Sequence, residues 1–134
     1  MAKQKGRLFL LPSPIHENGL VSISPEVIGI IHSLDHFIVE KARTARRFVS
    51  LTKHPEKIET LHFEEMPVDD ANDDEIEMML KPCLEGRNIG LLSEAGSPAI
   101  ADPGSHYVRV AQKLGIQIVP LSGPSSLMMA LMAS

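Results

Sequence analysis

LLSEAGSPAIADPGSHYVRVA, residues 91–111, is the stretch that decides how the rest of the chain is interpreted. Its apolar run stops at Ser93, and the next eleven residues contain two glycines, two prolines and two acids before a helical pattern begins. Loops of this length in compact domains are usually either functional or disordered. The proline and alanine content of this loop argues against a flexible segment. The stretch therefore predicts a buried strand, then a rigid binding loop, then a helix.

Short apolar runs alternate with helical patterns along the whole chain. Strands are predicted at residues 7–12, 36–40, 61–66, 88–93 and within 115–120. Helices are predicted from Ser24-Pro25, over the basic segment after residue 40, over residues 69–84, from Asp102-Pro103 to Leu114, and from Pro124. Short strands that alternate with helices of ten to fifteen residues are typical of an α/β domain. We therefore predict a mostly parallel sheet with helices on both faces.

The bulk composition is that of an ordinary globular domain. The 134 residues are 43% hydrophobic and 22% charged, which suits one domain with one core. The single Cys83 excludes an internal disulfide and any CxxC metal or redox motif. The sequence shows no export signal and no run approaching the roughly 20 apolar residues of a membrane helix. These features favour a cytoplasmic protein without a membrane segment.

The net charge of −4 hides two segments of opposite sign. Residues 41–53 carry five basic residues and no acid, whereas residues 64–77 carry eight acids and no base. On a helix, Arg43, Arg46 and Arg47 share one face, and apolar side chains share the other. Such a face can be simply solvated, but arginines without an intervening acid also suit phosphate contact. The acidic segment repels RNA, so we expect it to lie away from any RNA site.

Three loops rich in serine, glycine and proline follow predicted strands: PSPIHENG (12–19), SEAGSPAIADPG (93–104) and PLSGPSS (120–126). In open parallel sheets, ligands bind beyond the carboxyl ends of the strands. Glycine allows a close approach of backbone to ligand, and proline holds the shape of a loop. Neither a GxGxxG fingerprint nor a Walker GK[ST] motif is present. The loops predict a ligand site of another kind.

These loops, in this order, resemble the tetrapyrrole methylase superfamily, and within it the branch that methylates ribosomal RNA. The matching segments are Pro12-Ser13-Pro14-Ile15, Glu40-Lys41-Ala42-Arg43, Ser93 through Gly104, and Val119 through Ser125. Two positions depart from the pattern of that branch. His16-Glu17-Asn18-Gly19-Leu20 replaces Gly-Asn-Leu, and Lys41-Ala42 replaces Asp-Thr. The cofactor assignment is therefore firmer than the substrate assignment.

The resemblance implies a methyltransferase that uses S-adenosylmethionine and transfers methyl to a ribose 2′-hydroxyl of a cytidine in small-subunit ribosomal RNA. It also implies two α/β domains with the cofactor between them, and a homodimer. The cofactor-binding residues are then Pro12, Ser93, Glu94, Ala95, Gly96, Ser97, Pro98, Ile100, Ser122, Gly123, Ser125 and Ser126. Glu40 and Arg43 are the candidate catalytic residues, and Arg43, Arg46 and Arg47 are the candidate RNA-binding residues.

Several alternatives stay open at the level of sequence. Glu40 could act as a general base on the hydroxyl, with Arg43 holding a phosphate, or the two could form a structural ion pair. A tetrapyrrole could replace RNA as the substrate, or the chain could be a non-catalytic RNA- or nucleotide-binding domain. His32 and His36 are four residues apart, but a strand begins at His36, so we expect no metal site.

The end of the chain leads to one more expectation. The helix predicted from Pro124 reaches Ser134 without a glycine stop and without a following strand. Members of the superfamily continue into a second domain. We therefore expect residues 1–134 to be an amino-terminal α/β domain from which the second domain is absent. Such a domain folds, binds the cofactor weakly and turns nothing over.

Overall fold

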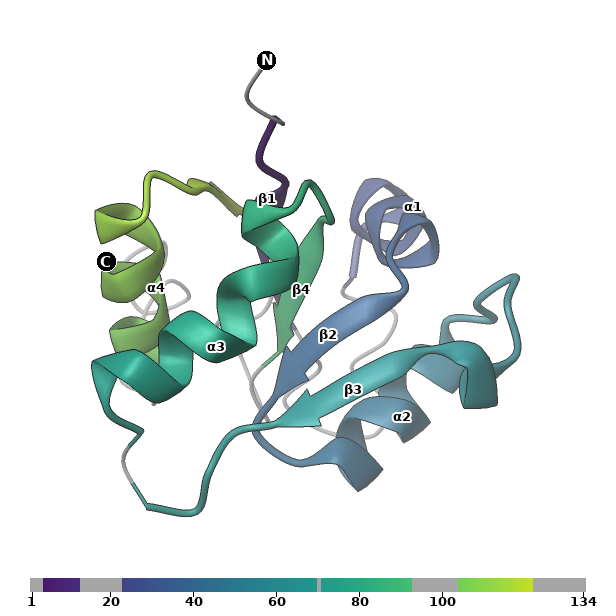
Figure 1. Ribbon diagram of the computed structural model, residues 1–134. Helices are drawn as coiled ribbons and strands as arrows, with labels where there is room; N and C mark the ends of the chain where they lie inside the picture. Colours follow the sequence, from purple (N-terminus) through teal and green to yellow (C-terminus); the bar gives the residue numbers. More distant parts are fainter. Residues whose placement is uncertain (1–3, 13–22, 70, 93–103, 122–134) are drawn as a thin grey trace, which may run out of the picture.

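The computed structural model describes residues 4–12, 23–69, 71–92 and 104–121, and Figure 1 shows them in colour. Within these residues, five strands form one sheet: β1 (Arg7–Leu11), β2 (His36–Val39), β3 (His62–Glu65), β4 (Ile89–Leu92) and β5 (Gln117–Pro120). In the same described part of the chain, four α-helices accompany them: α1 (Pro25–Ser33), α2 (Ala42–Leu51), α3 (Asp73–Leu84) and α4 (Gly104–Lys113). A short 3-10 helix, η2 (Ile58–Thr60), precedes β3.

The sheet has the order β3-β2-β4-β1-β5, and every pair of neighbouring strands is parallel. The inner strands β2 and β4 are buried along their whole length, whereas the edge strands β3 and β5 are partly exposed. Continuous burial explains why β4 and residues 37–39 of β2 read as apolar runs. The predicted parallel α/β fold is confirmed.

Each face of the sheet carries its own apolar core. Figure 1 shows the helices that accompany the sheet. On one face, α1 and α2 pack against Phe9, Leu11, Phe37, Val39 and Leu92. On the other face, α3 and α4 pack against residues that alternate with these along the same strands, among them Leu8, Leu10, Ile38 and Leu91. The predicted covering of both faces by helices is therefore confirmed.

Local signals position most helix ends. The Ser24 hydroxyl accepts a hydrogen bond from the Val27 N–H at 3.2 Å, and Pro25 is the first residue of α1. Gly86 and Gly115 follow α3 and α4 with φ of 105° and 75°, a conformation that glycine adopts without strain. The predicted end of α4 is correct to within one residue.

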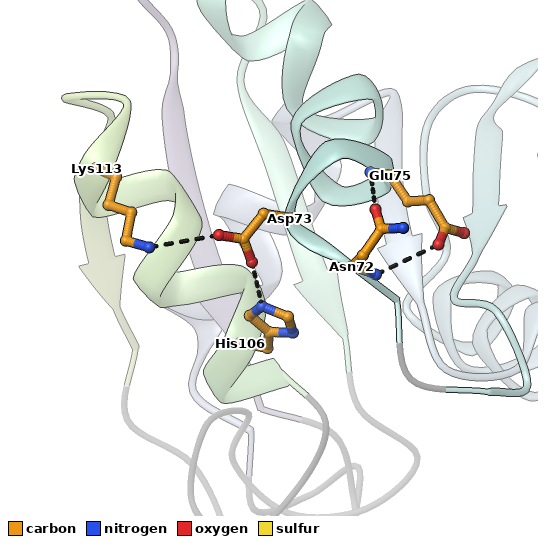
Figure 2. A network of polar contacts seen from close by, with 5 residues as sticks. All are labelled: Asn72, Asp73, Glu75, His106 and Lys113. Carbon is orange, nitrogen blue, oxygen red and sulfur yellow. Dashed lines mark hydrogen bonds and ion pairs between the residues drawn. The ribbon is translucent and has the colours of Figure 1, made fainter.

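The predicted start of α3 at residue 69 is wrong, because the helix begins at Asp73. Asn72 has extended backbone dihedrals, and its side chain accepts from the Glu75 N–H at 2.9 Å. The Glu75 carboxylate accepts from the Asn72 N–H at 3.3 Å, which completes a capping box (Figure 2). This reciprocal pair satisfies two amide groups and so fixes the helix start after the acidic turn.

Among the described residues, no helix has the length and apolar character needed to cross a membrane. The predicted helix from Pro124 lies outside the described residues.

Candidate functional site at the carboxyl ends of the strands

The three predicted ligand loops follow three neighbouring strands. In the sheet, β1 lies between β4 and β5, with Leu11 opposite Leu92 and Leu10 opposite Pro120. Because adjacent strands are about 4.8 Å apart, the three loops leave the sheet within roughly 10 Å of one another. The topology therefore brings together the starting points of segments that are far apart in the sequence.

This edge also contains the topological switch point of the sheet, where the connections that follow two neighbouring strands go to opposite faces. After β1 the chain leads to α1 on one face, and after β4 it leads to α4 on the other face. Neighbouring strands whose connections diverge in this way leave a crevice between their carboxyl ends, where α/β domains bind ligands. The β1–β4 pair is such a switch point. Two of the predicted loops begin there.

Of the predicted cofactor-binding residues, Pro12 is described, and it is buried directly after β1. The others lie outside the described residues: Ser93, Glu94, Ala95, Gly96, Ser97, Pro98, Ile100, Ser122, Gly123, Ser125 and Ser126. Their contacts with a cofactor stay a prediction from sequence.

A cavity of about 980 Å³ opens beside this edge, at the ends of β2 and β3. Glu40, the residue after β2, and Arg43, in the first turn of α2, both line it. The cavity is also lined by Lys41, Glu65, Met66, Pro67, Val68, Asp69, Ala71, Ser105, His106, Tyr107 and Arg109. The two candidate catalytic residues thus face one concave surface. The lining contains both basic and acidic side chains.

The acidic segment does not lie away from the site, which corrects the sequence-based expectation. Glu65 and Asp69 line the same cavity as Arg43. The reason is topological: β3 runs parallel to β2, so its carboxyl end and the turn that follows reach the same edge of the sheet. Negative charge therefore borders the cavity on the β3 side.

The arginine face of α2, defined as Arg43, Arg46 and Arg47, is exposed as predicted, and Ala45, Phe48 and Val49 are buried beneath it. Arg46 has a second contact: its guanidinium carbon lies 5.6 Å from the centre of the Phe63 ring on β3. A cation over an aromatic face is held by the ring quadrupole, and its outward edge stays available to a phosphate. The amphipathic division of this helix follows directly from the sequence.

A polar network joins α3 and α4 beside the cavity (Figure 2). Asp73, the first residue of α3, accepts from His106 Nε2 at 2.7 Å and from Lys113 Nζ at 3.4 Å, both on α4. These hydrogen bonds, that of His106 first, hold the pKa of the Asp73 carboxyl below its ordinary value. The network fixes the first turn of α4, which carries His106 into the cavity wall.

Tyr107 lies one residue further along α4 and is buried. Burial, and then the charges of Glu64 and Glu75, raise the pKa of its phenol to about 12. Its hydroxyl donates to the Met79 sulfur at 3.7 Å. The phenol therefore stays protonated near neutral pH, and it supports the cavity wall rather than acting as a base.

Sequence reasoning missed the contribution of β3 and α4 to this cavity. Met66 to Asp69 follow a weak edge strand, and Ser105 and Arg109 belong to a helix that reads as a simple amphipathic one. The available signal was the order of elements, since every strand of a parallel sheet ends at the same edge. The pairing of β2 with β3 was needed to use it.

Five parallel strands, helices on both faces and a cavity at the carboxyl ends define a doubly wound α/β domain. A family model described as tetrapyrrole (corrin/porphyrin) methylases matches residues 19–134. The chain belongs to this family.

Similar proteins of known name agree with this assignment. Ribosomal RNA small subunit methyltransferase I of Escherichia coli O157:H7 is 32% identical over 130 residues, which are 97% of this chain and 43% of the relative. The protein of the same name from Vibrio cholerae is 31% identical over 127 residues, 95% of this chain and 41% of the relative. The chain thus spans less than half the length of these relatives.

Among solved structures, a uroporphyrin-III-C-methyltransferase from Thermus thermophilus has a similar fold, with a TM-score of 0.62 and 17% identity. The likeness covers 97% of this chain and 53% of that one. At this identity the likeness concerns the fold alone.

Proposed function

We propose that the chain is part of an S-adenosylmethionine-dependent methyltransferase that acts on small-subunit ribosomal RNA, with a cytidine ribose 2′-hydroxyl as the acceptor. One observation carries the proposal: Glu40 and Arg43 line a cavity at the carboxyl edge of the sheet, and Arg43 also belongs to the exposed arginine face of α2. The names of the similar proteins support ribosomal RNA as the substrate class.

The cofactor would be held where β4, β1 and β5 end side by side. The strand ends fit such a group, because they meet at a switch point and lead into glycine- and proline-rich loops. When bound, S-adenosylmethionine supplies an activated methyl group on a positive sulfur. The main task of the protein is then to align the acceptor oxygen with that methyl, which is a positioning effect.

Glu40 and Arg43 have distinct proposed roles at this site. A ribose hydroxyl is a weak nucleophile at neutral pH, and a carboxylate within hydrogen-bond reach can accept its proton. Glu40 is half-buried at the end of β2 and lines the cavity, which suits a base. Arg43 is exposed in the first turn of α2, and its planar guanidinium can hold a phosphate through two hydrogen bonds.

The arginine face favours RNA over a tetrapyrrole as the substrate. Three exposed arginines on one helix suit a phosphate backbone, whereas a small macrocycle requires contacts inside the cavity only. The acidic residues Glu65 and Asp69 border the cavity on the β3 side, so we propose that the RNA backbone runs along α2 and away from β3. We propose a cytoplasmic location as well, because the proposed substrate is ribosomal RNA. A homodimer and a second domain that completes the cofactor cleft belong to the same proposal.

The RNA part of the proposal is tested by salt-dependent binding. The triple variant R43A/R46A/R47A should bind small-subunit ribosomal RNA more weakly. The negative slope of log K against log salt should become shallower by about 2, since each contact to single-stranded RNA contributes roughly 0.7 to its magnitude. The control variant K57A/K81A removes two exposed charges elsewhere and should leave the slope nearly unchanged. Equal slopes for the triple variant and the wild type would contradict a role of this face.

The methyltransferase part is tested with labelled cofactor. With the full-length protein, which includes the proposed second domain, label should appear in ribosomal RNA from subunits that lack the modification, and Gly96→Phe should abolish cofactor binding measured by calorimetry. Label in a corrin or porphyrin instead would favour the tetrapyrrole alternative. RNA binding without any cofactor binding would favour a non-catalytic domain.

A further inference from the structure

Three side chains with metal-binding groups meet on the α3/α4 face of the sheet, outside the cavity. His36 opens β2 and His62 opens β3, and the two residues are register partners with ring centres 4.4 Å apart. Glu64 lies two residues after His62 and so points to the same face. Its Oε2 atom is 3.9 Å from His36 Nε2 and 4.0 Å from His62 Nε2.

The His36 ring is the unusual member of this cluster. Its side chain is 9% exposed, and its buried Nε2 atom has no hydrogen-bond partner among the residues that the structure describes. Buried polar atoms are nearly always paired, so such an atom requires an explanation, and a bound ion is one. Burial, and then the charges of His62 and Arg87, lower the pKa of His36 to about 4. The ring is therefore neutral near pH 7, the form that binds metals.

We propose that His36, His62 and Glu64 form a site for a divalent transition-metal ion of the zinc class. Two imidazole nitrogens and one carboxylate oxygen are a donor set that holds zinc with a fourth position left to water. Magnesium and calcium prefer oxygen ligands, so this set disfavours them.

The geometry is close to what zinc requires. Metal–ligand bonds of about 2.0–2.1 Å place tetrahedral donors roughly 3.4 Å apart. The three donor atoms lie within 4.8 Å of one another. Small side-chain rotations would therefore bring them to the spacing of tetrahedral donors. His36 is held rigidly by its burial, whereas the side chains of His62 and Glu64 are 61% and 38% exposed and can rotate toward it. The exposed side also gives the ion a path from solvent.

The surrounding charges are compatible with a cation. Arg87 is the nearby positive group, and its guanidinium is paired with Asp35 at 2.8 Å. The Glu64 carboxylate contributes one negative charge to the cluster. The net environment is thus not positive.

The position of the site indicates a structural role. Both histidines are the first residues of their strands, at the end of the sheet opposite to the cavity that Glu40 and Arg43 line, and β3 is an edge strand. An ion bound there would join β3 to β2 through side chains as well as through the backbone ladder. At a metal concentration 100 times the dissociation constant, the ratio of folded to unfolded protein should rise about 100-fold.

This proposal replaces the expectation from sequence that the chain has no metal site. That expectation considered His32 and His36, which the structure separates: His32 lies on α1 and its Nε2 contacts the Thr52 carbonyl at 2.6 Å. The actual partner of His36 is His62, 26 positions later in the sequence. Only the pairing of two parallel strands brings these rings together.

The test is a Zn²⁺ titration of the chelator-treated 134-residue chain by calorimetry, with Co²⁺ as a spectroscopic probe. We expect one Zn²⁺ per chain with micromolar or tighter affinity, and a Co²⁺ absorption typical of four-coordination. His62→Ala and Glu64→Gln should each weaken Zn²⁺ binding at least 10-fold, since loss of even an outer-shell partner costs about 10–100-fold.

The controls remove the same chemical groups elsewhere. His106→Asn removes an imidazole on α4, and Glu59→Gln removes an exposed carboxylate before β3. Both should retain the wild-type affinity for Zn²⁺. Circular dichroism of each variant verifies the fold, and Glu64→Gln alone decides the question should His62→Ala unfold. Failure to bind Zn²⁺ below about 100 µM, or unchanged affinity in both cluster variants, overturns the proposal.

Discussion

Removal of the Glu65 carboxylate should destabilise the amino-terminal end of α2, the helix that carries the candidate RNA-binding arginines. Lys41 occupies the N-cap position but makes no side-chain capping bond, and the first turn of α2 contains no acid. The cap of α2 comes instead from a residue of β3: Glu65 Oε1, at the end of that strand, accepts a hydrogen bond from the Ala42 N–H at 2.8 Å. A carboxylate at this position also interacts favourably with the helix dipole.

The magnitude follows from the type of contact. A hydrogen bond to a charged group contributes about 1.5–3 kcal/mol, and loss of a helix cap costs about 0.5–2 kcal/mol. Glu65 is exposed, so solvent screens part of this interaction. We expect Glu65→Ala to lower the free energy of unfolding by about 1–2 kcal/mol, and Glu65→Gln, which keeps an acceptor oxygen, by about half as much.

The assay is urea unfolding at pH 7 followed by circular dichroism, because the chain contains no tryptophan. Glu59→Ala removes an exposed carboxylate before β3 and should change the free energy of unfolding by no more than about 0.5 kcal/mol. Hydrogen exchange of the Ala42 amide provides a local readout, and it should become faster in Glu65→Ala. Equal effects of Glu65→Ala and Glu59→Ala, with unchanged exchange at Ala42, would refute the reasoning.

Three further substitutions test the packing. Gly6→Ala would place a methyl group against the Arg87 carbonyl oxygen, a rigid backbone atom, closer than van der Waals contact allows, so it should lower the free energy of unfolding by about 1–3 kcal/mol. Gly29→Ala in α1 meets nothing within 4 Å and should raise the free energy of unfolding by about 0.5–1 kcal/mol. Equal signs for the two glycines in urea unfolding would contradict this. Leu80→Ala, at a fully buried position of α3, should cost about 2–5 kcal/mol, and a cost below 1 kcal/mol would show that this core is loosely packed.

The sequence by itself determined the elements and their class. Apolar runs, the Ser24-Pro25 start and the glycines after α3 and α4 act within a few residues, and each was correctly interpreted without a structure. The exposed arginine face of α2 also followed from spacing alone, since the period of a helix is a local property. The start of α3 was misplaced because the cap that ends the acidic turn is Asn72, one polar residue among several. The sequence motifs in the loops were sufficient to identify the family.

Only the tertiary structure decided which distant segments meet. It placed β1 between β4 and β5, so that the three predicted ligand loops begin at one edge, and it brought the acidic turn after β3 to the cavity of Arg43. It also paired His36 with His62 and supplied the cap of α2 from Glu65. Spacing along the chain carries no information on such contacts, because strand order depends on how the helices share the two faces of the sheet. That choice is made by packing the whole core, and no single segment of the sequence contains it.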